Sequence, residues 1–264
     1  MLRPNKHLVP TSVDLIINRR HPMTNGLVGA YLPGVSRVDF TGMNGQLTYI
    51  DTGGAGAACT GVPAVTTEGP SMGNSASTRN ALATNPAGTI SSQIASWSSQ
   101  ISCYTRFRQI GSAGSSNGGL FFITDATHSA IGISAIGATS NLYSMYSGGF
   151  NSTGAEGAAV SLGVHGFCIS MLGNTFTSTM WLDGAVYLTA TNMLVSACTL
   201  ASTYLSIGGF SDESILALYF WNRSLTQTDA MTLESDPYGI FTSRSDDWQG
   251  TRKSSRSLRR LGLA

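Results

Sequence analysis

Apolar and polar positions divide most of the chain into short segments. Eleven stretches rich in aromatic and β-branched residues lie between clusters of Gly, Ser, Asn and Asp. This spacing is typical of strands joined by turns, and eleven strands suffice for two packed sheets. We predict strands at residues 26–32, 46–50, 100–110, 119–125, 130–136, 141–147, 165–172, 178–182, 185–190, 203–209 and 215–222.

Side chains alternate within the segment 100–110, as they do in a half-buried strand. One face would carry Cys103, Thr105, Phe107 and Gln109, and the other Tyr104, Arg106, Arg108 and Ile110. Neither face is apolar throughout, so the pattern leaves open which of them faces the core.

The sequence MWLDGAVY, residues 180–187, indicates a hairpin. Asp183 and Gly184 separate two apolar segments, as a two-residue turn requires, and glycine accepts a positive φ without steric cost. Residues 51–99 give no such signal. They are rich in Gly, Ala, Ser, Thr and Asn, which favours long loops between weak strands, and we assign no strand positions there.

One helix is predicted, over residues 227–235. Thr226 can cap it, and Asp229 stands at the spacing of a capping box, in which each side chain bonds the other residue's backbone amide. Leu225 and Ala230 are spaced as a hydrophobic staple.

The residues after this helix predict where it ends. Asp236 precedes Pro237 and is therefore biased away from helical geometry. Tyr238, Ile240 and Phe241 follow, and we expect them to form an apolar plug for an edge or corner of the fold. The helix is interpreted as a structural element.

Composition supports an all-β protein. Charged residues make up 11% of the chain, well below the usual share of about 25%. The longest apolar run, residues 215–221, is far shorter than the roughly 20 residues that span a bilayer. The first twenty residues lack the apolar core of a secretory signal, so we expect retention in a cytoplasm, where Cys59, Cys103, Cys168 and Cys198 would be buried free thiols.

Charge is divided unevenly along the chain. Residues 1–22 carry four basic side chains against one acidic, a net charge of +3, and residues 243–264 carry six against two, a net charge of +4. The middle carries five basic and eleven acidic side chains, a net charge of −6. This layout suggests basic arms that dock on another molecule or on neighbouring copies. The candidate docking residues are Arg3, Lys6, Arg19, Arg20, Arg244, Arg252, Lys253, Arg256, Arg259 and Arg260.

Several motifs of the chain resemble those of laminin G-like, concanavalin A-like jelly-roll domains, in the version common in virion proteins of tailed bacteriophages. The matching segments are RRHPMTNGLVGAYL (19–32), Asn44-Gly45, MWLDG (180–184), IGG (207–209), YFWNRSLT (219–226) and DPY (236–238). The segments at 99–105 and 164–167 depart from the family's motifs but keep apolar alternation.

Together the patterns and the resemblance predict an all-β fold, a two-sheet antiparallel jelly-roll sandwich with one short C-terminal helix and extended terminal arms. The expected organisation is a basic arm at 1–22, the sandwich at 23–242 and a basic tail at 243–264. Members of the wider family hold Ca²⁺ through Asp and loop carbonyls. Here Asp125, Asp183 and Asp212 match that role only in residue type, and no cofactor is predicted.

Enzymatic chemistry is not indicated. Glycoside hydrolysis needs two facing carboxyl groups, which the glucanases of the superfamily place by an E-x-D-x-E strand, and this chain has no such motif. Residues 114–118 spell G-x-S-x-G within a glycine- and serine-rich stretch, without the strand and helix that a nucleophile elbow requires. The four histidines, His7, His21, His128 and His165, have no spacing typical of metal ligands.

The expected function is therefore that of a non-enzymatic bacteriophage virion protein, either a capsid decoration or a tail- or fibre-associated protein. Its partners would be other virion proteins, including copies of itself, and its location the virion. Neither a membrane nor nucleic acid is expected as a partner. The alternative is a lectin-like module that binds host surface glycans, for which Tyr143, Tyr146, Phe150 and Asn151 are clustered in sequence.

Overall fold

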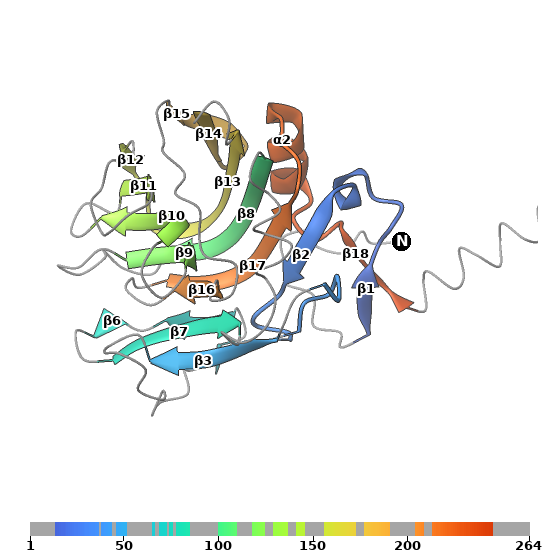
Figure 1. The fold of residues 1–264 in the computed structure, drawn as a ribbon, viewed down its shortest axis with the longest axis horizontal. Helices are drawn as coiled ribbons and strands as arrows, with labels where there is room; N and C mark the ends of the chain where they lie inside the picture. Colours follow the sequence, from blue (N-terminus) through green and yellow to red (C-terminus); the bar gives the residue numbers. More distant parts are fainter. Residues whose placement is uncertain are drawn as a thin grey trace, which may run out of the picture.

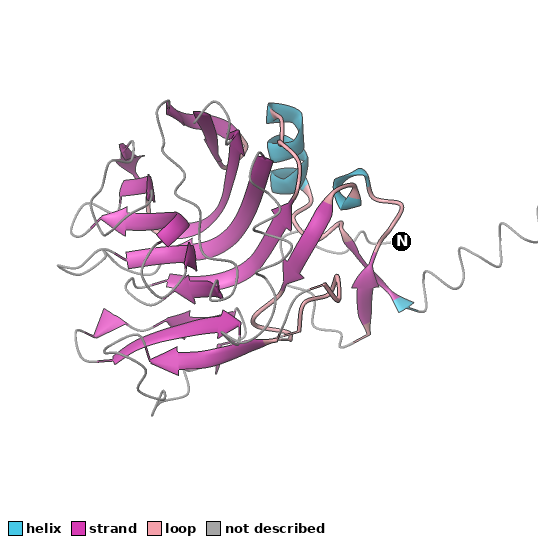
Figure 2. Ribbon diagram, viewed as in Figure 1, coloured by secondary structure: helices cyan, strands magenta, loops and turns pink. Residues whose placement is uncertain are grey.

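The structure is a computed structural model. It describes residues 14–36, 38–43, 46–51, 65–66, 69–72, 74–75, 78–84, 100–109, 118–124, 129–136, 141–145, 156–172, 177–190, 204–208 and 213–244. These residues form two large antiparallel sheets, a small two-stranded sheet and one short α-helix (Figures 1 and 2). In the described part of the chain, no helix is long and apolar enough to cross a membrane.

The first sheet has eight strands and follows the order β12-β11-β10-β9-β16-β7-β3, with β6 paired to β7. Each pairing in it is antiparallel. Its strands are β12 (Glu156–Ala159), β11 (Asn141–Met145), β10 (Ser129–Ile136), β9 (Gly118–Thr124), β16 (Tyr204–Gly208), β7 (Thr78–Thr84), β3 (Leu47–Asp51) and β6 (Asn74–Ser75).

The second sheet, also of eight strands, follows the order β15-β14-β13-β8-β17-β5-β4, with β2 paired to β17. Its pairings are antiparallel as well. Its strands are β15 (Ala185–Ala190), β14 (Thr177–Leu182), β13 (Gly163–Leu172), β8 (Gln100–Gln109), β17 (Glu213–Trp221), β5 (Gly69–Met72), β4 (Val65–Thr66) and β2 (Leu27–Tyr31). The predicted all-β sandwich with one short helix is thereby confirmed.

All eleven predicted strands are present, with bounds within two residues of the prediction; they are β2, β3, β8–β11 and β13–β17. The segment 51–99, for which no strand was assigned, contributes β4 to β7. The sequence also gave no indication of β12, nor of β1 (Leu15–Ile17) and β18 (Phe241–Ser243), which pair with each other.

Both faces of strand β8, in the second sheet, are buried. Residues 102–107 of β8 are all buried, although they alternate between the two faces. Tyr104 belongs to a core cluster with Leu233 of the helix and with Ile240, so the helix layer covers its face. Phe107 lies on the other face and is also fully buried, inside the sandwich. This extra layer explains why neither face of this strand is exposed.

Helix α2 (Gln227–Ser235) begins and ends as the sequence predicts. The hydroxyl of Thr226 accepts from the Asp229 amide at 3.2 Å, and the Thr226 amide donates to the Asp229 carboxylate at 2.9 Å. The helix ends at Asp236, and Leu225 and Ala230 both lie in the core cluster. The capping box and the helix end are confirmed.

The residues that follow α2 seal this layer. Tyr238, Ile240 and Phe241 are buried, as the predicted apolar plug requires. The hydroxyl of Tyr219 donates to the Pro237 carbonyl at 2.9 Å, which holds the segment onto β17. Beside helix α2, Asp183 and Gly184 turn β14 into β15 with φ angles of 52° and 77°, which confirms the predicted hairpin.

Candidate docking site at the paired chain segments

The two basic segments enter and leave the described body through one small sheet. Strands β1 and β18 pair antiparallel, with Leu15 opposite Ser243, Ile16 opposite Thr242 and Ile17 opposite Phe241. The ladder continues at both ends, since the Arg244 amide donates to the Asp14 carbonyl at 3.0 Å and the Asn18 amide to the Ile240 carbonyl at 2.7 Å. We call this pair of strands the ribbon.

One face of the ribbon packs on the body. Leu15 and Ile17 pack against the core cluster, and Phe241 belongs to it. The Phe241 ring meets the rings of Phe40 and Tyr219 edge-on, at centroid distances of 5.1 and 5.8 Å. Aromatic contacts of this kind add to the free energy gained by burial. The ribbon is therefore held in place by side chains and not only by its ladder.

The antiparallel pairing brings the two basic segments together. Residue 13 precedes Asp14 and residue 245 follows Arg244, and Asp14 and Arg244 are neighbours across the ladder. Cα atoms in such a hydrogen-bonded pair lie about 5.5 Å apart. Figure 1 shows the ribbon at the opposite side of the molecule from β10, β11 and β12. The predicted arms thus depart from adjacent points on one side of the sandwich.

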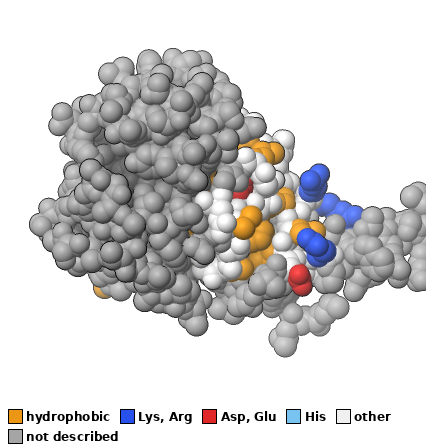
Figure 3. All heavy atoms as spheres, turned by 60° about the horizontal axis from the view of Figure 1, so that its bottom comes forward, with side chains coloured by type: hydrophobic (Ala, Val, Ile, Leu, Met, Phe, Trp, Pro, Cys, Tyr) orange, Lys and Arg blue, Asp and Glu red, His pale blue; other side chains and the backbone are white. Residues whose placement is uncertain are grey.

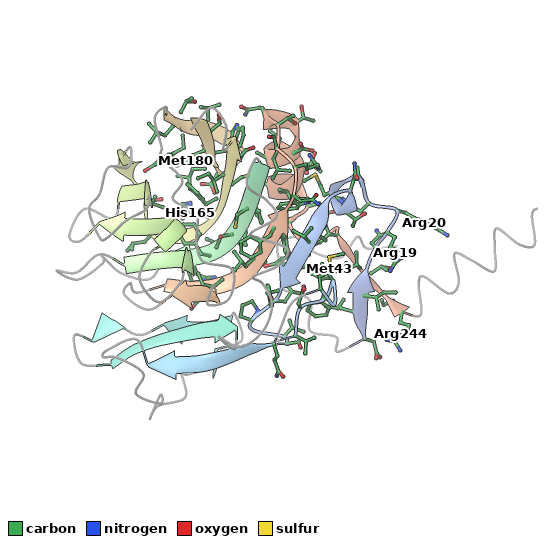
Figure 4. All side chains as sticks on the ribbon, viewed as in Figure 1. Arg19, Arg20, Met43, His165, Met180 and Arg244 are labelled. Carbon is green, nitrogen blue, oxygen red and sulfur yellow. The ribbon has the colours of Figure 1, made fainter. Side chains whose placement is uncertain are left out.

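Three of the predicted docking residues are described, and all three lie at the ribbon. Arg19 and Arg20 are exposed in the turn between β1 and the 3₁₀ helix η1 (Pro22–Thr24), and Arg244 is exposed just after β18 (Figure 4). The Asn18 side chain shapes this turn, accepting from the Arg20 amide at 3.3 Å. The other predicted docking residues lie outside the described residues: Arg3, Lys6, Arg252, Lys253, Arg256, Arg259 and Arg260.

Two described arginines elsewhere in the body, Arg106 and Arg223, form ion pairs within the chain. Arg106, with 5% of its side chain exposed, lies 2.6 Å from the Glu234 carboxylate, and Arg223 lies 3.1 Å from that of Asp229. In contrast, no carboxylate among the described residues forms an ion pair with Arg19, Arg20 or Arg244. The arginine side chains coloured in Figure 3 lie at the ribbon side of that view. The exposed Arg19, Arg20 and Arg244 are therefore candidates for contact with a partner.

His21, beside the same turn, adds no charge near neutral pH. Burial lowers the pKa of its ring below the ordinary value, and the nearby Asp236 only partly opposes this shift. The backbone amide of Met23 donates to Nδ1 of His21 at 3.3 Å, so the ring acts as the cap of η1. His21 and Pro22 therefore both have structural roles: the His21 ring caps η1, and Pro22 is its first residue.

Ser161, His165 and Asp183 resemble a hydrolase triad but are bonded differently. Nδ1 of His165 lies 2.8 Å from the Asp183 carboxylate, and Nε2 lies 2.9 Å from the Ser161 carbonyl and 3.4 Å from its hydroxyl. Nε2 lies nearer to the Ser161 carbonyl than to the Ser161 hydroxyl, so the ring bridges the Asp183 side chain and the backbone at Ser161. The arrangement joins the loop before β13 to the Asp183 turn.

The remaining candidate ligands are accounted for as follows. The Asp183 carboxylate bonds His165 and accepts from the Gly166 amide at 2.9 Å, so both of its oxygens serve the fold. Among the described residues, no three His, Cys, Asp or Glu side chains come together as metal ligands would. The other candidates lie outside the described residues or side chains: Asp125, Asp212, His7, His128, Tyr143, Tyr146, Phe150, Asn151 and most of 114–118.

The two described cysteines are unreactive by environment. Cys103 and Cys168 are buried free thiols, and burial raises the pKa of each well above its ordinary value. A thiol needs to ionise to act as a nucleophile or a metal ligand. The prediction of buried free thiols is confirmed for this pair, while Cys59 and Cys198 lie outside the described residues.

No protein-family model matches the chain, and no curated protein matches it in sequence. Among solved structures, Trypanosoma rangeli sialidase in complex with 2,3-difluoro-KDN has a TM-score of 0.57 at 14% identity, over 87% of this chain and 37% of the sialidase. The binding domain of botulinum neurotoxin DC in complex with SialylT has a TM-score of 0.60 at 11% identity, over 81% of this chain and 52% of that one.

These similarities concern the fold. The chain spans between about a third and about a half of the length of the two proteins, and at so low an identity a shared fold does not carry a shared function. With the sheets and the ribbon described above, they place this protein among the β-sandwich, jelly-roll-like domains. In the described part of the chain, exposed arginines lie beside the paired strands β1 and β18.

Proposed function

We propose that this protein is a non-enzymatic structural component of a bacteriophage particle, either a capsid decoration or a tail-associated protein. Its sandwich is displayed on the particle, and its two basic segments attach it. The observation that carries the proposal is the pairing of β1 with β18, which starts both segments from one side of the body. The sequence motifs shared with phage jelly-roll proteins support the same role.

Charge supports attachment through this side. The segments 1–22 and 243–264 together carry a net charge of +7, and the middle of the chain carries −6. A body and an attachment surface of opposite sign orient the protein as it approaches an acidic partner. The exposed Arg19, Arg20 and Arg244 belong to the attachment surface because no described carboxylate neutralises them.

Attachment can be tested without disturbing the ribbon. In the full-length chain, the basic residues after β18 are replaced by Gln; they are Arg252, Lys253, Arg256, Arg259 and Arg260. We expect occupancy on purified particles, measured by quantitative mass spectrometry, to fall at least about tenfold, because several ion pairs are lost together. Replacing the four arginines by Lys keeps the charge and should keep the occupancy. Unchanged occupancy of the Gln variant rules out attachment through this segment.

A second candidate function is binding of a host glycan, the lectin-like alternative. The observation that favours it is the similarity of fold to a toxin binding domain determined in complex with SialylT and to a sialidase determined in complex with 2,3-difluoro-KDN. A glycan array probed with the full-length chain tests this candidate. Binding to a defined set of glycans at micromolar concentration supports it, and uniform absence of binding contradicts it.

A further inference from the structure

We propose that His21 forms an acid-sensitive latch, whose neutral ring holds the 3₁₀ helix η1 on the body and whose protonated ring releases it. The latch consists of the His21 ring, the Met23 amide that the ring caps, and the Asp236 carboxylate beside it. All of these residues lie next to the ribbon, in the segments 18–25 and 236–241. The inference does not depend on the proposed attachment role.

The contact between His21 and Met23 depends on the protonation state of the ring. Nδ1 of His21 accepts from the Met23 amide at 3.3 Å, as the cap of η1. In a neutral imidazole one nitrogen accepts and the other carries the hydrogen, so this contact assigns the hydrogen to Nε2. Protonation puts a hydrogen on Nδ1 as well. Two donors then face each other, and the hydrogen bond that caps η1 is lost.

The Asp236 carboxylate is placed to attract the charged ring. A Cβ on Gly239 would lie 3.0 Å from Nε2 of His21 and 2.8 Å from Oδ2 of Asp236, so both atoms border the same point of the chain. Burial, the larger effect, lowers the pKa of His21, and Asp236 opposes it by raising the pKa. The ring therefore becomes charged only as the pH falls below its ordinary value of about 6.5. It then exchanges the Met23 amide for the Asp236 carboxylate.

Charged side chains approach the ring from three elements. They are Arg19 and Arg20 in its own turn, Arg223 after β17, which donates to the Asn25 carbonyl at 3.0 Å, and Asp236 after α2. The two arginines of the turn are exposed, so solvent and salt screen their charges. Arg223 is paired with the Asp229 carboxylate at 3.1 Å. Asp236 is therefore the charge that acts on His21 most directly.

Trp221 reports whether η1 is held on the body. Its indole Nε1 donates to the Met23 carbonyl at 2.6 Å, and both side chains belong to the core cluster. Met23 thus makes two contacts, through its amide to His21 and through its carbonyl to Trp221. Because one residue makes both, loss of the cap also loosens the carbonyl and exposes the indole hydrogen to exchange with water.

The test measures hydrogen exchange of the Trp221 indole by NMR in the full-length chain, at pH 7.5 and pH 4.5. Division by the rate of free indole at the same pH removes the intrinsic pH dependence. We expect the protection of this indole to fall about tenfold in acid, because the cap is lost and two donors are opposed. The Trp181 indole, which donates to Gln227 at 3.0 Å, is the internal reference and should keep its protection within about twofold.

Two variants separate the roles of the ring and of the carboxylate. Asn is a good N-cap that does not titrate, so His21→Asn keeps an acceptor for the Met23 amide. Its Trp221 protection should be the same at both pH values. Asp236→Asn removes the charge that favours the imidazolium, so the midpoint of the change in Trp221 protection should move to lower pH.

Four results would overturn the inference. Unchanged Trp221 protection at pH 4.5 would show that the protonated ring does not release η1. An equal fall in His21→Asn would assign the acid sensitivity to another group. A parallel fall at Trp181 would show unfolding of the whole body in acid. An unchanged midpoint in Asp236→Asn would remove Asp236 from the latch, and this variant tests the proposal even where His21→Asn does not fold.

Discussion

Arg106 and Glu234 form a buried charge pair between elements far apart in the sequence. Nη1 of Arg106 on β8 donates to both carboxylate oxygens of Glu234 on α2, at 2.6 and 2.8 Å. The carboxylate fits there because Gly166 on β13 has no side chain; a Cβ at this position would collide with Glu234 and lie 2.8 Å from the Tyr104 hydroxyl. The glycine therefore permits the pair that holds the helix on the sheet.

Gly166→Ala tests this arrangement. The added methyl group displaces Glu234 and leaves the Arg106 guanidinium buried without its partner, so we expect the free energy of unfolding to fall by about 3 kcal/mol. Urea unfolding at pH 7 measures it. Gly42→Ala, where φ is 72° and no atom lies within 4 Å, controls for backbone strain and should cost about 1 kcal/mol. A loss at Gly166 no larger than that of the control contradicts the interpretation.

Asp229 makes the helix start sensitive to acid. Burial raises its pKa, but hydrogen bonds from Arg223 and Thr226 and the Arg223 charge together outweigh burial and lower the pKa below its usual value. A lowered folded-state pKa contributes stability that is fully present above the unfolded-state value, about 4, and is lost as pH falls through the folded-state value.

The variant Asp229→Asn isolates this contribution. At pH 7 we expect it to lose about 1 to 2 kcal/mol of unfolding free energy, since it removes the ion pair with Arg223 and replaces the carboxylate that accepts from the Thr226 amide by a neutral carbonyl oxygen. As pH falls below about 4, the original carboxyl is itself protonated, so the difference between variant and parent should shrink. Urea unfolding at pH 7 and pH 3 measures both values. A difference independent of pH contradicts the electrostatic explanation.

Substitutions at Ser161 and His165 test whether the contacts among Ser161, His165 and Asp183 are structural or form a catalytic triad. Ser161→Ala keeps the carbonyl that bonds Nε2, so we expect stability to change by less than about 0.5 kcal/mol. His165→Ala breaks the contacts to Ser161 and Asp183 and should cost about 2 to 3 kcal/mol. Thermal unfolding monitors both variants. If the parent protein hydrolyses a p-nitrophenyl ester and Ser161→Ala does not, the purely structural interpretation of these contacts is wrong.

At the scale of elements, strands with strong side-chain preferences were predictable from sequence. Runs such as ILALYFW (215–221) contain enough aromatic and aliphatic residues to specify a strand locally, and every residue of this run is buried in β17. Its continuous apolar character, without alternation, was a signal that both faces of the sheet are covered. Helix α2 was predictable for the same reason, because the residues that begin and end it, from Thr226 to Pro237, lie within a dozen positions.

Other strands depend on partners rather than on their own residues. Strand β7 (TRNALAT) lies between β16 and β3, and β12 (EGAA) pairs with β11, yet neither has a strong β preference. The ribbon is the extreme case, since β1 and β18 have three residues each and come from opposite parts of the sequence. Short-range patterns carry no information about such a pairing, which is why the sequence did not reveal it.

A cross-strand disulfide tests whether the ribbon forms in solution. Ile16 and Thr242 are direct partners in the ladder, at the Cα separation that a disulfide accepts. We expect Ile16→Cys/Thr242→Cys to oxidise readily and to raise the unfolding free energy by up to about 5 kcal/mol, because it closes a very long loop. Thermal unfolding with and without reductant gives the gain, and each single cysteine serves as a control. A double variant that stays reduced under oxidising conditions contradicts the pairing.

At the scale of the whole molecule, the sequence predicted which segments are basic and which are acidic, but not where the basic segments lie relative to each other. Counting residues gave two basic segments and an acidic middle. Only the pairing of β1 with β18 shows that the segments start together, and only the structure separates exposed Arg19, Arg20 and Arg244 from buried Arg106. The sequence therefore predicted the basic residues of the candidate docking site, and the pairing of β1 with β18 brings its two parts together.

The central claim is that both basic segments meet one partner from one side of the sandwich. Lys6 and Lys253 allow a direct test, because they are the chain's only lysines and lie one in each segment. Assembled particles are treated with an amine-reactive cross-linker and analysed by mass spectrometry. The account predicts links between Lys6 and Lys253 within one chain, and links from both to the same neighbouring protein. Links from the two lysines to different, well-separated partners, with none between them, would contradict it.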